Sequence, residues 1–265
     1  MTTLSLTVSG ATGRMGRAVA RLAAGMDGLR VVGGIARGTG SDGALASGYE
    51  RVEAVESAGP VIEAADAIID FSAPEQIDRI LREHADALAG RALIVGTTGL
   101  DPATHERLDR AAEHGPVVVA ANFSIGVNLL EALVEEAARR LPAERYDVEI
   151  VEAHHRRKAD SPSGTALALG RALAAARDDS LDRRRRDGRS GRIGERPRGE
   201  IGLHAVRGGD VTGEHRVLFL GDRERIELAH AAHDRSLFAE GALVAARWAA
   251  GRDAGRYGMR DVLGL

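Results

Sequence analysis

The chain of 265 residues lacks cysteine, which excludes disulfides, zinc–thiolate sites, iron–sulfur clusters and cysteine nucleophiles. Aromatic residues make up only 3%, so few rings are present on which nucleic-acid bases could stack. The net charge of -3 also disfavours a dominant phosphate-binding surface. The sequence shows neither an apolar run long enough to span a membrane nor a recognisable secretory signal. We therefore expect a globular cytoplasmic protein that binds neither nucleic acid nor membranes.

Lysine is almost absent as well, because all but one of the 36 basic residues are arginine. A bias toward arginine codons accounts for the arginines but not for the exception, Lys158. Arginine stays protonated in proteins, whereas the pKa of a lysine can be tuned by its surroundings. Lys158 is therefore a candidate for a functional role.

The first half of the chain alternates short apolar runs with amphipathic helical segments. This pattern is typical of right-handed βαβ units in a parallel sheet. The predicted strands cover residues 4–9, 29–36, 67–71, 92–95 and 117–120, and the predicted helices cover 14–24, 74–88 and 102–113.

The second half follows a different pattern, in which strands come in succession without helices between them. This arrangement is typical of an α+β domain with a mixed or antiparallel sheet. The predicted strands lie around 148–151 and over 200–207, 216–220 and 225–230, and the predicted helices cover 126–141, 162–177 and 237–250. Asp160 or Ser161 is the expected N-cap of the helix that begins at Pro162.

Two further segments of the second half have distinctive compositions. The segment 177–198 holds nine arginines against five acidic residues. Its composition favours a solvated, mobile loop, and an RNA-binding or targeting patch is the alternative. The glycine-rich segment 207–215 is typical of a hairpin turn between two strands.

A glycine-rich segment follows the first predicted strand and opens the first predicted helix. It consists of Gly10, Ala11, Thr12, Gly13, Arg14, Met15 and Gly16. Glycines at this place let the backbone approach a pyrophosphate, which binds at the positive end of the helix. A glycine turn without a ligand is the alternative. After the second strand, where an acid often binds the adenosine ribose, the chain has Arg37, which suits a 2′-phosphate unless it is only a surface cation.

Two more loops follow the fourth and fifth predicted strands. One contains Gly96, Thr97 and Thr98, and the other contains Ala121, Asn122 and Phe123. Ligands of open α/β sheets bind at the carboxyl ends of the strands. We therefore expect these loops to frame a nicotinamide ring, although each loop alone could be an ordinary turn.

The densest group of reactive side chains lies in the segment 152–165. His154 and His155 can donate a proton near neutral pH, and Lys158 can serve as a cation or, with a lowered pKa, as an acid. The helix expected next would offer free N–H groups to a carboxylate. These N–H groups belong to Ser163, Gly164 and Thr165. A basic solvated loop before an ordinary helix is the alternative, and adjacent histidines on a strand do not predict a metal site.

Together these motifs resemble the 4-hydroxy-tetrahydrodipicolinate reductase (dihydrodipicolinate reductase) family of diaminopimelate and lysine biosynthesis. The resemblance extends over nearly the whole chain, and the segment 152–165 is its most specific part. It implies that His154 is the general acid and that Lys158 takes part in acid catalysis and substrate binding. The implied substrate-binding residues are His155, Ser163, Gly164 and Thr165. The residues expected to bind the cofactor are Gly10, Ala11, Thr12, Gly13, Arg14, Met15, Gly16, Arg37, Phe71, Gly96, Thr97, Thr98, Ala121, Asn122 and Phe123.

The resemblance also implies an α/β fold with two domains. Residues 1–124 and 235–265 are expected to form a Rossmann-like dinucleotide-binding domain completed by the C-terminal helix. Residues 125–234 are expected to form an α+β domain for substrate binding and oligomerisation.

The activity implied by the resemblance is the reduction of 4-hydroxy-tetrahydrodipicolinate, a small dicarboxylate, with NADPH and/or NADH. The expected assembly is a homotetramer, and no metal is expected. The alternatives are another two-domain NAD(P)-dependent dehydrogenase or a regulator that senses NADP without catalysis. Another dehydrogenase would explain the first domain equally well but not the cluster of residues 154–165.

Overall fold

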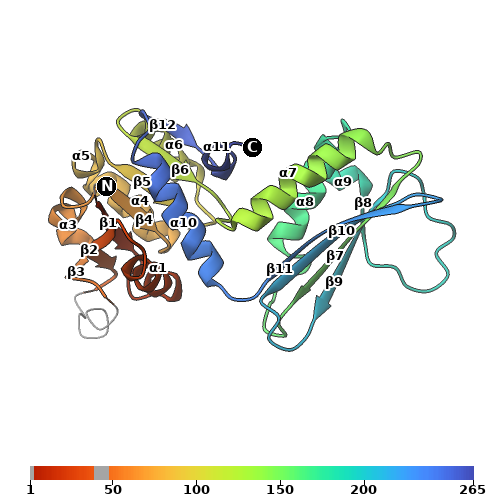
Figure 1. Ribbon diagram of the computed structural model, residues 1–265, viewed down its shortest axis with the longest axis horizontal. Helices are drawn as coiled ribbons and strands as arrows, with labels where there is room; N and C mark the ends of the chain where they lie inside the picture. Colours follow the sequence, from red (N-terminus) through yellow and green to blue (C-terminus); the bar gives the residue numbers. More distant parts are fainter. Residues whose placement is uncertain (1–2, 39–47) are drawn as a thin grey trace. The chain divides into compact units, whose positions relative to one another are not determined.

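The structure, a computed structural model, describes residues 3–38 and 48–265 (Figure 1). The chain divides into two compact units. The first comprises Met1–Ile125 and Ser236–Leu265, and the second comprises Gly126–Arg235. Within the described residues, no helix is long and apolar enough to cross a membrane.

The first unit is built on a seven-stranded parallel sheet with the strand order β12-β6-β5-β4-β1-β2-β3. Its strands are β1 (Leu4–Ser9), β2 (Leu29–Ala36), β3 (Val52–Ala54), β4 (Ala67–Asp70), β5 (Ala92–Val95), β6 (Pro116–Val119) and β12 (Gly255–Tyr257). The central strands β4 and β5 consist of buried residues, as expected of a parallel sheet covered on both faces.

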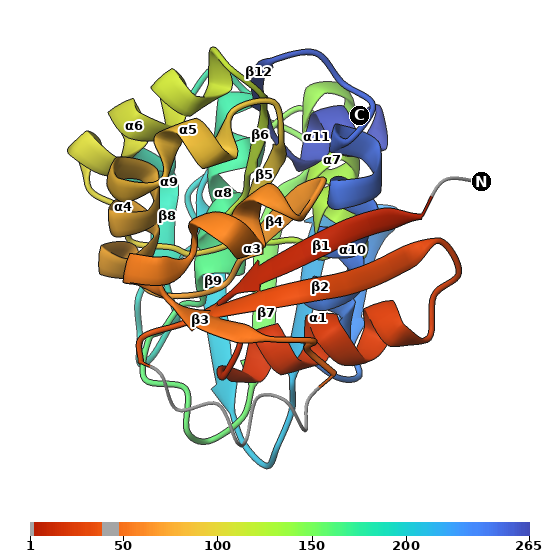
Figure 2. The same cartoon turned by 90° about the vertical axis from the view of Figure 1, so that its left-hand side faces the viewer.

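Helices cover both faces of this sheet (Figure 2). One face packs against α1 (Arg14–Ala24), α10 (Ser236–Ala249) and α11 (Met259–Leu263). The other face packs against α3 (Gly59–Glu63), α4 (Pro74–Glu83), α5 (Ala85–Leu88) and α6 (Pro102–Ala112). Successive strand residues point to opposite faces, so Ile69 joins the first core whereas Ile68 joins the second.

The predicted Rossmann-like sheet with a C-terminal helix packed on it is confirmed. The single helix predicted over 74–88 is wrong. His84 leaves the helical conformation, with φ -130° and ψ 28°, and ends α4 before α5 begins. Its Nε2 lies 2.6 Å from the carbonyl oxygen of Val55, in a 3-10 turn, η1 (Val55–Ser57). The shorter elements β3, η1, α3, β12 and α11 were not predicted, because three to five residues are too few to reveal a periodicity.

The second unit contains a five-stranded mixed sheet with the order β11-β10-β7-β9-β8. Its strands are β7 (Asp147–His154), β8 (Arg185–Asp187), β9 (Ile201–Arg207), β10 (Gly213–Leu220) and β11 (Arg225–Ala232). β9 runs parallel to β7 and β8, whereas β10 runs antiparallel to β7 and β11. The mixed sheet that the sequence left as one of two possibilities is thus the one formed.

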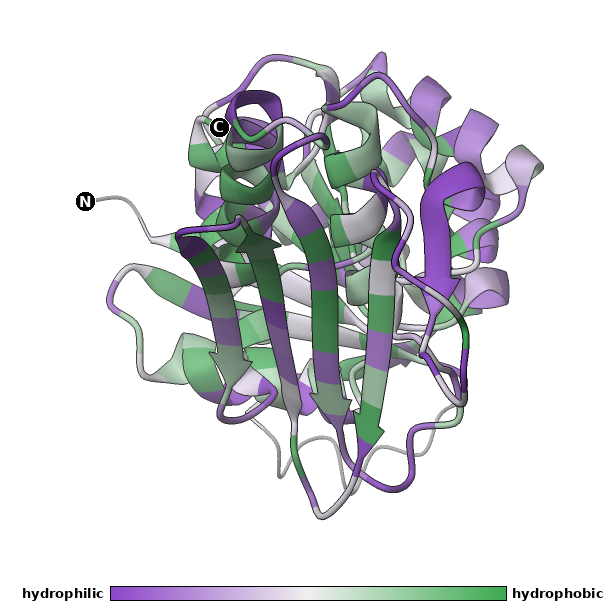
Figure 3. Ribbon diagram, turned by 90° about the vertical axis from the view of Figure 1, so that its right-hand side faces the viewer, coloured by the Kyte–Doolittle hydropathy of each residue, from purple (hydrophilic) through white to green (hydrophobic). Residues whose placement is uncertain are grey.

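Helices α7 (Ile125–Arg140) and α8 (Gly164–Ala175) pack on one face of this sheet. Val148 and Ile150 of β7 belong to the core between the sheet and these helices. Because strand side chains alternate, Glu152 and His154 continue along the same face, and Glu149 lies on the opposite one. Figure 3 shows this opposite face, over which the described residues of the second unit place no helix.

The hairpin predicted for the segment 207–215 is wrong. β9 and β10 are not neighbours, because β7 lies between them. The connecting loop therefore crosses the end of β7, where Gly208 N–H donates to the carbonyl of His154 and His155 N–H donates to the carbonyl of Val211. This crossing brings the loop against the segment that carries the paired histidines.

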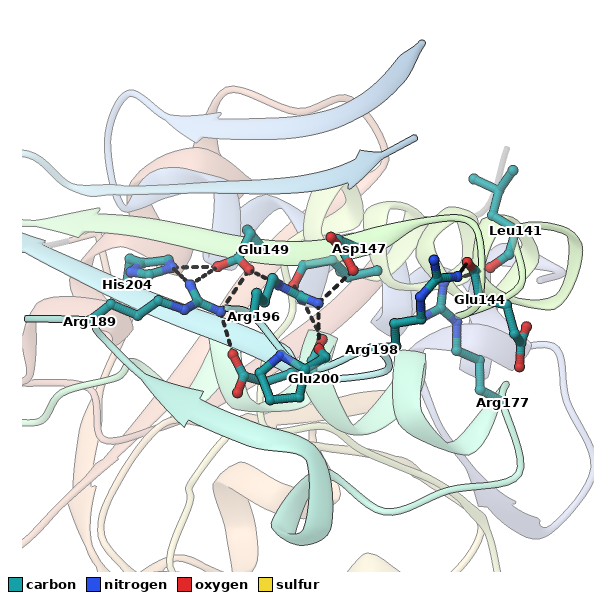
Figure 4. Close-up of polar contacts among 12 residues, drawn as sticks. Leu141, Glu144, Asp147, Glu149, Arg177, Arg189, Arg196, Arg198, Glu200 and His204 are labelled. Carbon is teal, nitrogen blue, oxygen red and sulfur yellow. Dashed lines mark hydrogen bonds and ion pairs between the residues drawn. The ribbon is translucent and has the colours of Figure 1, made fainter. Parts of the chain in front are cut away.

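The solvated loop predicted for 177–198 is confirmed only in part, because most of its residues are exposed but the segment also forms α9 (Leu181–Arg184) and β8. Ion pairs tie the segment to β7 (Figure 4). Arg189 approaches both oxygens of Glu149, at 2.7 and 3.0 Å. Arg196 Nε donates to the same carboxylate at 2.8 Å, and His204 Nε2 lies 2.6 Å from it. Directly across the β7–β9 pair stands Gly202, where a Cβ would collide with this carboxylate. Glycine here leaves the space that the ion cluster occupies.

Burial alone would raise the pKa of Glu149, but Arg189, His204 and Arg196 lower it to about 2. The ordinary value is 4.5, so the native state holds this carboxyl ionised far below the pH at which the unfolded chain protonates it. The cluster therefore contributes stability above pH 4.5, and that stability is lost as the pH falls through about 2.

We expect Glu149→Gln to lower the free energy of unfolding by about 3 kcal/mol at pH 7, because two arginines lose a buried counter-charge. The deficit relative to the wild type should shrink as the pH approaches 2. Urea unfolding at several pH values measures both effects. Glu50→Gln, which breaks an exposed pair with Arg30, is the control and should change stability by less than about 1 kcal/mol. Equal stability of Glu149→Gln and the wild type at pH 7 would show that the ion cluster around Glu149 does not stabilise the fold.

Candidate active site

The sequence-predicted cofactor residues lie in loops at the carboxyl ends of β1, β2, β4, β5 and β6 in the first unit, except Arg14, Met15 and Gly16, which form the first turn of α1. Gly10 has φ 83°, and a Cβ there would approach the Phe71 carbonyl oxygen to 2.5 Å. Gly13 is the N-cap of α1 and donates to the Gly10 carbonyl at 2.8 Å. A Cβ at Gly16 would collide with the same carbonyl. Side chains at these positions would close the loop, so glycines keep a backbone cradle open at the start of α1.

An aromatic pair shapes the neighbouring part of this edge. The rings of Phe71 and Phe123 meet edge to face with centroids 5.8 Å apart. A Cβ at Gly96 would collide with the Phe71 ring, and one at Gly241 of α10 would collide with the Phe123 carbonyl. Two glycines, one of them from the C-terminal helix, therefore let the loops after β4, β5 and β6 close together.

A buried carboxyl that was not among the predicted site residues connects three of these strand ends. Asp70, the last residue of β4, is 0% exposed. It accepts hydrogen bonds from Thr97 Oγ1 at 2.5 Å and Ser72 Oγ at 2.6 Å, and the N–H of Ser72 donates to Thr97 Oγ1 at 2.9 Å. Burial raises the pKa of Asp70, while the hydroxyls of Ser72, Ser9 and Thr97 oppose the rise. The Thr97 hydroxyl is therefore occupied in shaping the loops.

Other predicted cofactor residues present their side chains at the surface of the first unit. The exposed ones are Thr12, Arg14, Arg37, Thr98 and Ala121. Met15 and Asn122 are partly buried, and the side-chain oxygen of Asn122 accepts from the N–H of Ser124 at 2.8 Å. Arg14 and Arg37 are therefore both exposed at the edge of the sheet that carries the glycine cradle.

The paired histidines of the second unit occupy different environments. His154 ends β7, and its Nδ1 lies 2.6 Å from Oε2 of Glu152. Glu152 has a fully buried side chain that is also held by both terminal nitrogens of Arg207, at 2.7 Å each. His155 is partly buried, and burial and the nearby arginines, Arg157 first, lower its pKa.

The start of α8 differs from the prediction. The helix begins at Gly164, and its N-cap is Ser163, whose Oγ accepts from the Ala166 N–H at 3.2 Å. Asp160 and Ser161 are therefore not the cap. The Ser163 N–H is not free for an anion, because it donates to Glu152 Oε1 at 2.9 Å. Gly164 is exposed at the first position of the helix, where a Cβ would meet nothing within 4 Å.

Lys158 lies in the loop between β7 and α8. Its Nζ is 2.9 Å from Oδ1 of Asp160, and the two side chains are 21% and 62% exposed. The hydrogen bond from Lys158 is the largest of the effects that lower the pKa of Asp160. An ion pair with so exposed a partner contributes at most about 1 kcal/mol, so another carboxylate can replace Asp160.

A third histidine, which the sequence analysis did not assign to the site, lies beside the first. His215 of β10 is 4% exposed, and its ring meets that of His154 edge to face at 5.2 Å. Its Nε2 is 3.0 Å from Ser163 Oγ. Burial, and then the proximity of His154, lowers the pKa of His215 to about 4, so its ring is neutral at pH 7.

The structure thus brings His154, Ser163 and the start of α8 together around Glu152. Glu152, Arg207 and His215 complete the group, and the sequence analysis gave none of them a role. Glu152 stands two residues before His154, so the strand period places both on one face and could have revealed it. Arg207 and His215 come from β9 and β10, and only the strand order reveals their position.

Parallel strands that end in glycine loops usually bind a dinucleotide, and a histidine that can hand over a proton complements the addition of hydride. Among the described residues, no group of His, Asp and Glu could hold a metal ion. The class of protein that this fold and site define is therefore a nicotinamide-dependent oxidoreductase.

Comparison of the sequence with known families identifies the particular group. The profile described as dihydrodipicolinate reductase, N-terminus, matches residues 4–123, and the corresponding C-terminus profile matches residues 126–263. The chain belongs to the dihydrodipicolinate reductase family.

Individual relatives agree with this membership. A 4-hydroxy-tetrahydrodipicolinate reductase of Methylocella silvestris is 45% identical over 99% of this chain and 97% of its own length. One of Granulibacter bethesdensis is 47% identical over 93% of this chain and 96% of its own length.

Solved structures show the same fold. A dipicolinate-bound dihydrodipicolinate reductase of Paenisporosarcina sp. TG-14 superimposes with a TM-score of 0.76 and 23% identity, over 98% of this chain and 99% of that one. An engineered D-amino acid dehydrogenase bound to NADP+ gives a TM-score of 0.56 at 15% identity, over 97% of this chain and 93% of that one. The fold is thus shared with other nicotinamide-dependent enzymes.

Proposed function

We propose that this chain reduces 4-hydroxy-tetrahydrodipicolinate to tetrahydrodipicolinate with NAD(P)H. The observation that carries the proposal is that Glu152 holds both His154 and Ser163, the N-cap of α8, in the second unit of a chain from this family. The relative with bound dipicolinate supports a small dicarboxylate as the substrate. Residues 1–124 and 235–265 would bind the cofactor, and residues 125–234 would bind the substrate.

The first unit is suited to a dinucleotide because Gly10, Gly13 and Gly16 keep the backbone open where α1 begins. Free N–H groups at the start of a helix attract a pyrophosphate. The loops containing Phe71, Gly96–Thr98 and Ala121–Phe123 would line the nicotinamide, and Arg14 and Arg37 would lie near the adenosine end. When bound, NAD(P)H supplies a hydride to a carbon of the unsaturated ring.

In the second unit, side chains would bind the carboxylates of the substrate and donate the proton that follows the hydride. A hydride that adds to one ring atom leaves an enamine-like electron pair, which must take up a proton. His154 delivers this proton from Nε2 in our proposal, since Nδ1 is engaged by Glu152. Lys158, His155 and the helix start at Ser163–Thr165 hold the two carboxylates, with Ser163 shaping this start because its own N–H is bound to Glu152.

The rival functions differ in what they oxidise. NADPH absorbance, followed with substrate generated in situ by the preceding synthase, distinguishes them. The reductase oxidises NADPH with this substrate, another dehydrogenase requires a different one, and a regulator binds NADPH without oxidising it.

We further propose a homotetramer in the cytoplasm, where a protein without cysteines needs no oxidising compartment. In the described part of the second unit, no helix covers the face of the five-stranded sheet opposite α7 and α8 (Figure 3). The alternation of side chains along β9 places Val206, which is 53% exposed, on this face. A sheet face that bears apolar side chains is commonly covered by another layer.

The first kinetic prediction concerns Lys158→Arg, which preserves the charge. The planar guanidinium is larger and does not release a proton at working pH, so it should fail where a compact ammonium approaches a carboxylate. We expect kcat to fall roughly 10²–10⁴-fold, more than KM rises, and His154→Ala to lose a similar factor. Steady-state assays measure both, and fluorescence titration should show unchanged NADPH binding. A Lys158→Arg enzyme within a few-fold of the wild type would assign the lysine no special role.

The cofactor prediction is a preference for NADPH that depends on Arg37. An acid at this position would repel a 2′-phosphate, so Arg37→Asp should shift the ratio of kcat/KM for NADPH and NADH toward NADH by roughly tenfold, about 1.4 kcal/mol. Arg30→Asp, at another exposed arginine, is the control and should leave the ratio unchanged. An identical ratio in Arg37→Asp and the wild type would reduce Arg37 to a surface cation.

The assembly prediction is that the protein sediments as a tetramer at micromolar concentration. Val206→Glu would place a charge on the open sheet face and should shift sedimentation toward smaller species. Ile193→Glu, at a similarly exposed apolar side chain outside the strands, should not. A wild-type monomer in sedimentation velocity would rule out the proposed assembly.

A further inference from the structure

The Glu152 carboxylate holds four hydrogen-bond donors that belong to three different parts of the second unit. Oε2 accepts from His154 Nδ1 and one nitrogen of Arg207, and Oε1 accepts from the Ser163 N–H and the other nitrogen of Arg207. His154 is the proposed proton donor, and Ser163 caps the helix whose start binds the substrate in the proposed function. One buried group is thus bonded to both halves of the proposed substrate site.

We propose that Glu152 is the positioning residue of the reaction: it fixes His154 as a proton donor at Nε2 and holds the start of α8 in place beside it. The assignment rests on the proposed function for the identity of the reaction. Its structural content, the orientation and tautomer of His154, can be tested without turnover.

The first part of the argument concerns the tautomer. An ionised carboxylate only accepts hydrogen bonds, so the contact with Oε2 at 2.6 Å requires a proton on His154 Nδ1. Nε2 is then the nitrogen that gains and releases the catalytic proton. A Cβ at Gly213 would lie only 3.0 Å from Nε2, so glycine at this position leaves the space beside the reactive nitrogen open.

The second part concerns the charge. Burial would raise the pKa of Glu152, but Arg207, His154 and the Ser163 N–H lower it. The two parallel bonds from Arg207 keep the carboxylate ionised in a place where water does not reach it. Glu152 therefore faces His154 as a fixed negative charge.

The groups that face His154 come from three strands. Glu152 lies on β7 itself, Arg207 comes from β9 and His215 from β10. His215 is neutral at pH 7, and Arg207 is paired with the carboxylate. Lys158, in the following loop, is paired with Asp160. Of these groups, Glu152 is the one whose oxygen contacts the ring nitrogen of His154.

A purely structural role is the competing explanation, since a buried carboxylate with four donors also stabilises the sheet. Glu149 provides a matched control, because it lies three residues earlier on the opposite face of the same strand and is likewise held by arginines. Glu149→Gln should lose stability without changing the surroundings of His154.

The kinetic test compares Glu152→Gln with Glu149→Gln and the wild type. The amide can donate to Nδ1 and favour the wrong tautomer, so we expect kcat to fall roughly 10²–10⁴-fold with little change in NADPH affinity. Glu149→Gln should keep the wild-type kcat. A Glu152→Gln enzyme with the wild-type kcat, or a matching loss in Glu149→Gln, overturns the proposal.

The second test uses ¹⁵N NMR of imidazole nitrogens in the full-length wild-type protein without substrate. Neutral His154, identified by comparison with His154→Ala, should carry its proton on Nδ1, and Glu152→Gln should remove this preference. A wild-type His154 protonated on Nε2 when neutral overturns the proposal even if the variant does not fold. Failure of the wild type to oxidise NADPH with the substrate would refute the proposed function instead, because the tautomer does not depend on turnover.

Discussion

A charge buried on a strand has to be neutralised where it lies, and β7 carries a fully buried carboxylate on one face and a largely buried one on the other. Glu149 is held by Arg189 and Arg196, and Glu152 by Arg207. Each carboxylate fixes chain segments remote in sequence: the first holds the arginine-rich segment on the open face, and the second holds the ends of β9 and α8 on the helix-covered face. The second unit is therefore organised around ion pairs as well as around its apolar core.

The local sequence pattern sufficed to predict the elements where strands and helices alternate along the chain. The alternation of apolar strands and amphipathic helices predicted the parallel sheet of the first unit. It could do so because the spacing of apolar residues within each strand or helix shows which of its residues are buried. It could not predict that the arginine-rich segment is ordered. Arg189 and Arg196 reach Glu149 across 40 and 47 residues, and a window of sequence that contains only the arginines appears merely solvated. Tertiary pairing overrides the local charge pattern.

In the candidate site, too, some features could be predicted from the local sequence and others depend on tertiary pairing. The segment that contains His154 and Lys158 is recognisable because its reactive residues are neighbours in the chain. The hairpin prediction, in contrast, treated Arg207 and His215 as parts of one turn. β7 lies between their strands, so they reach the site from opposite sides. The prediction that Ser163 offers a free N–H was wrong for a related reason, because the acceptor lies on a strand eleven residues earlier.

The contrast between Lys158 and the paired arginines explains why one lysine persists in an arginine-rich chain. Arg189 and Arg207 each place two nitrogens on a largely buried carboxylate, an arrangement that is rigid because the fork and the carboxylate match in one plane. Lys158 holds a single contact to Asp160, which is mostly exposed. An ammonium can form such a contact from many directions and exchange it for another carboxylate. Arginine thus suits the bonds that hold the fold, and lysine suits the place in the segment 152–165 where, in the function we propose, the partner changes during the reaction.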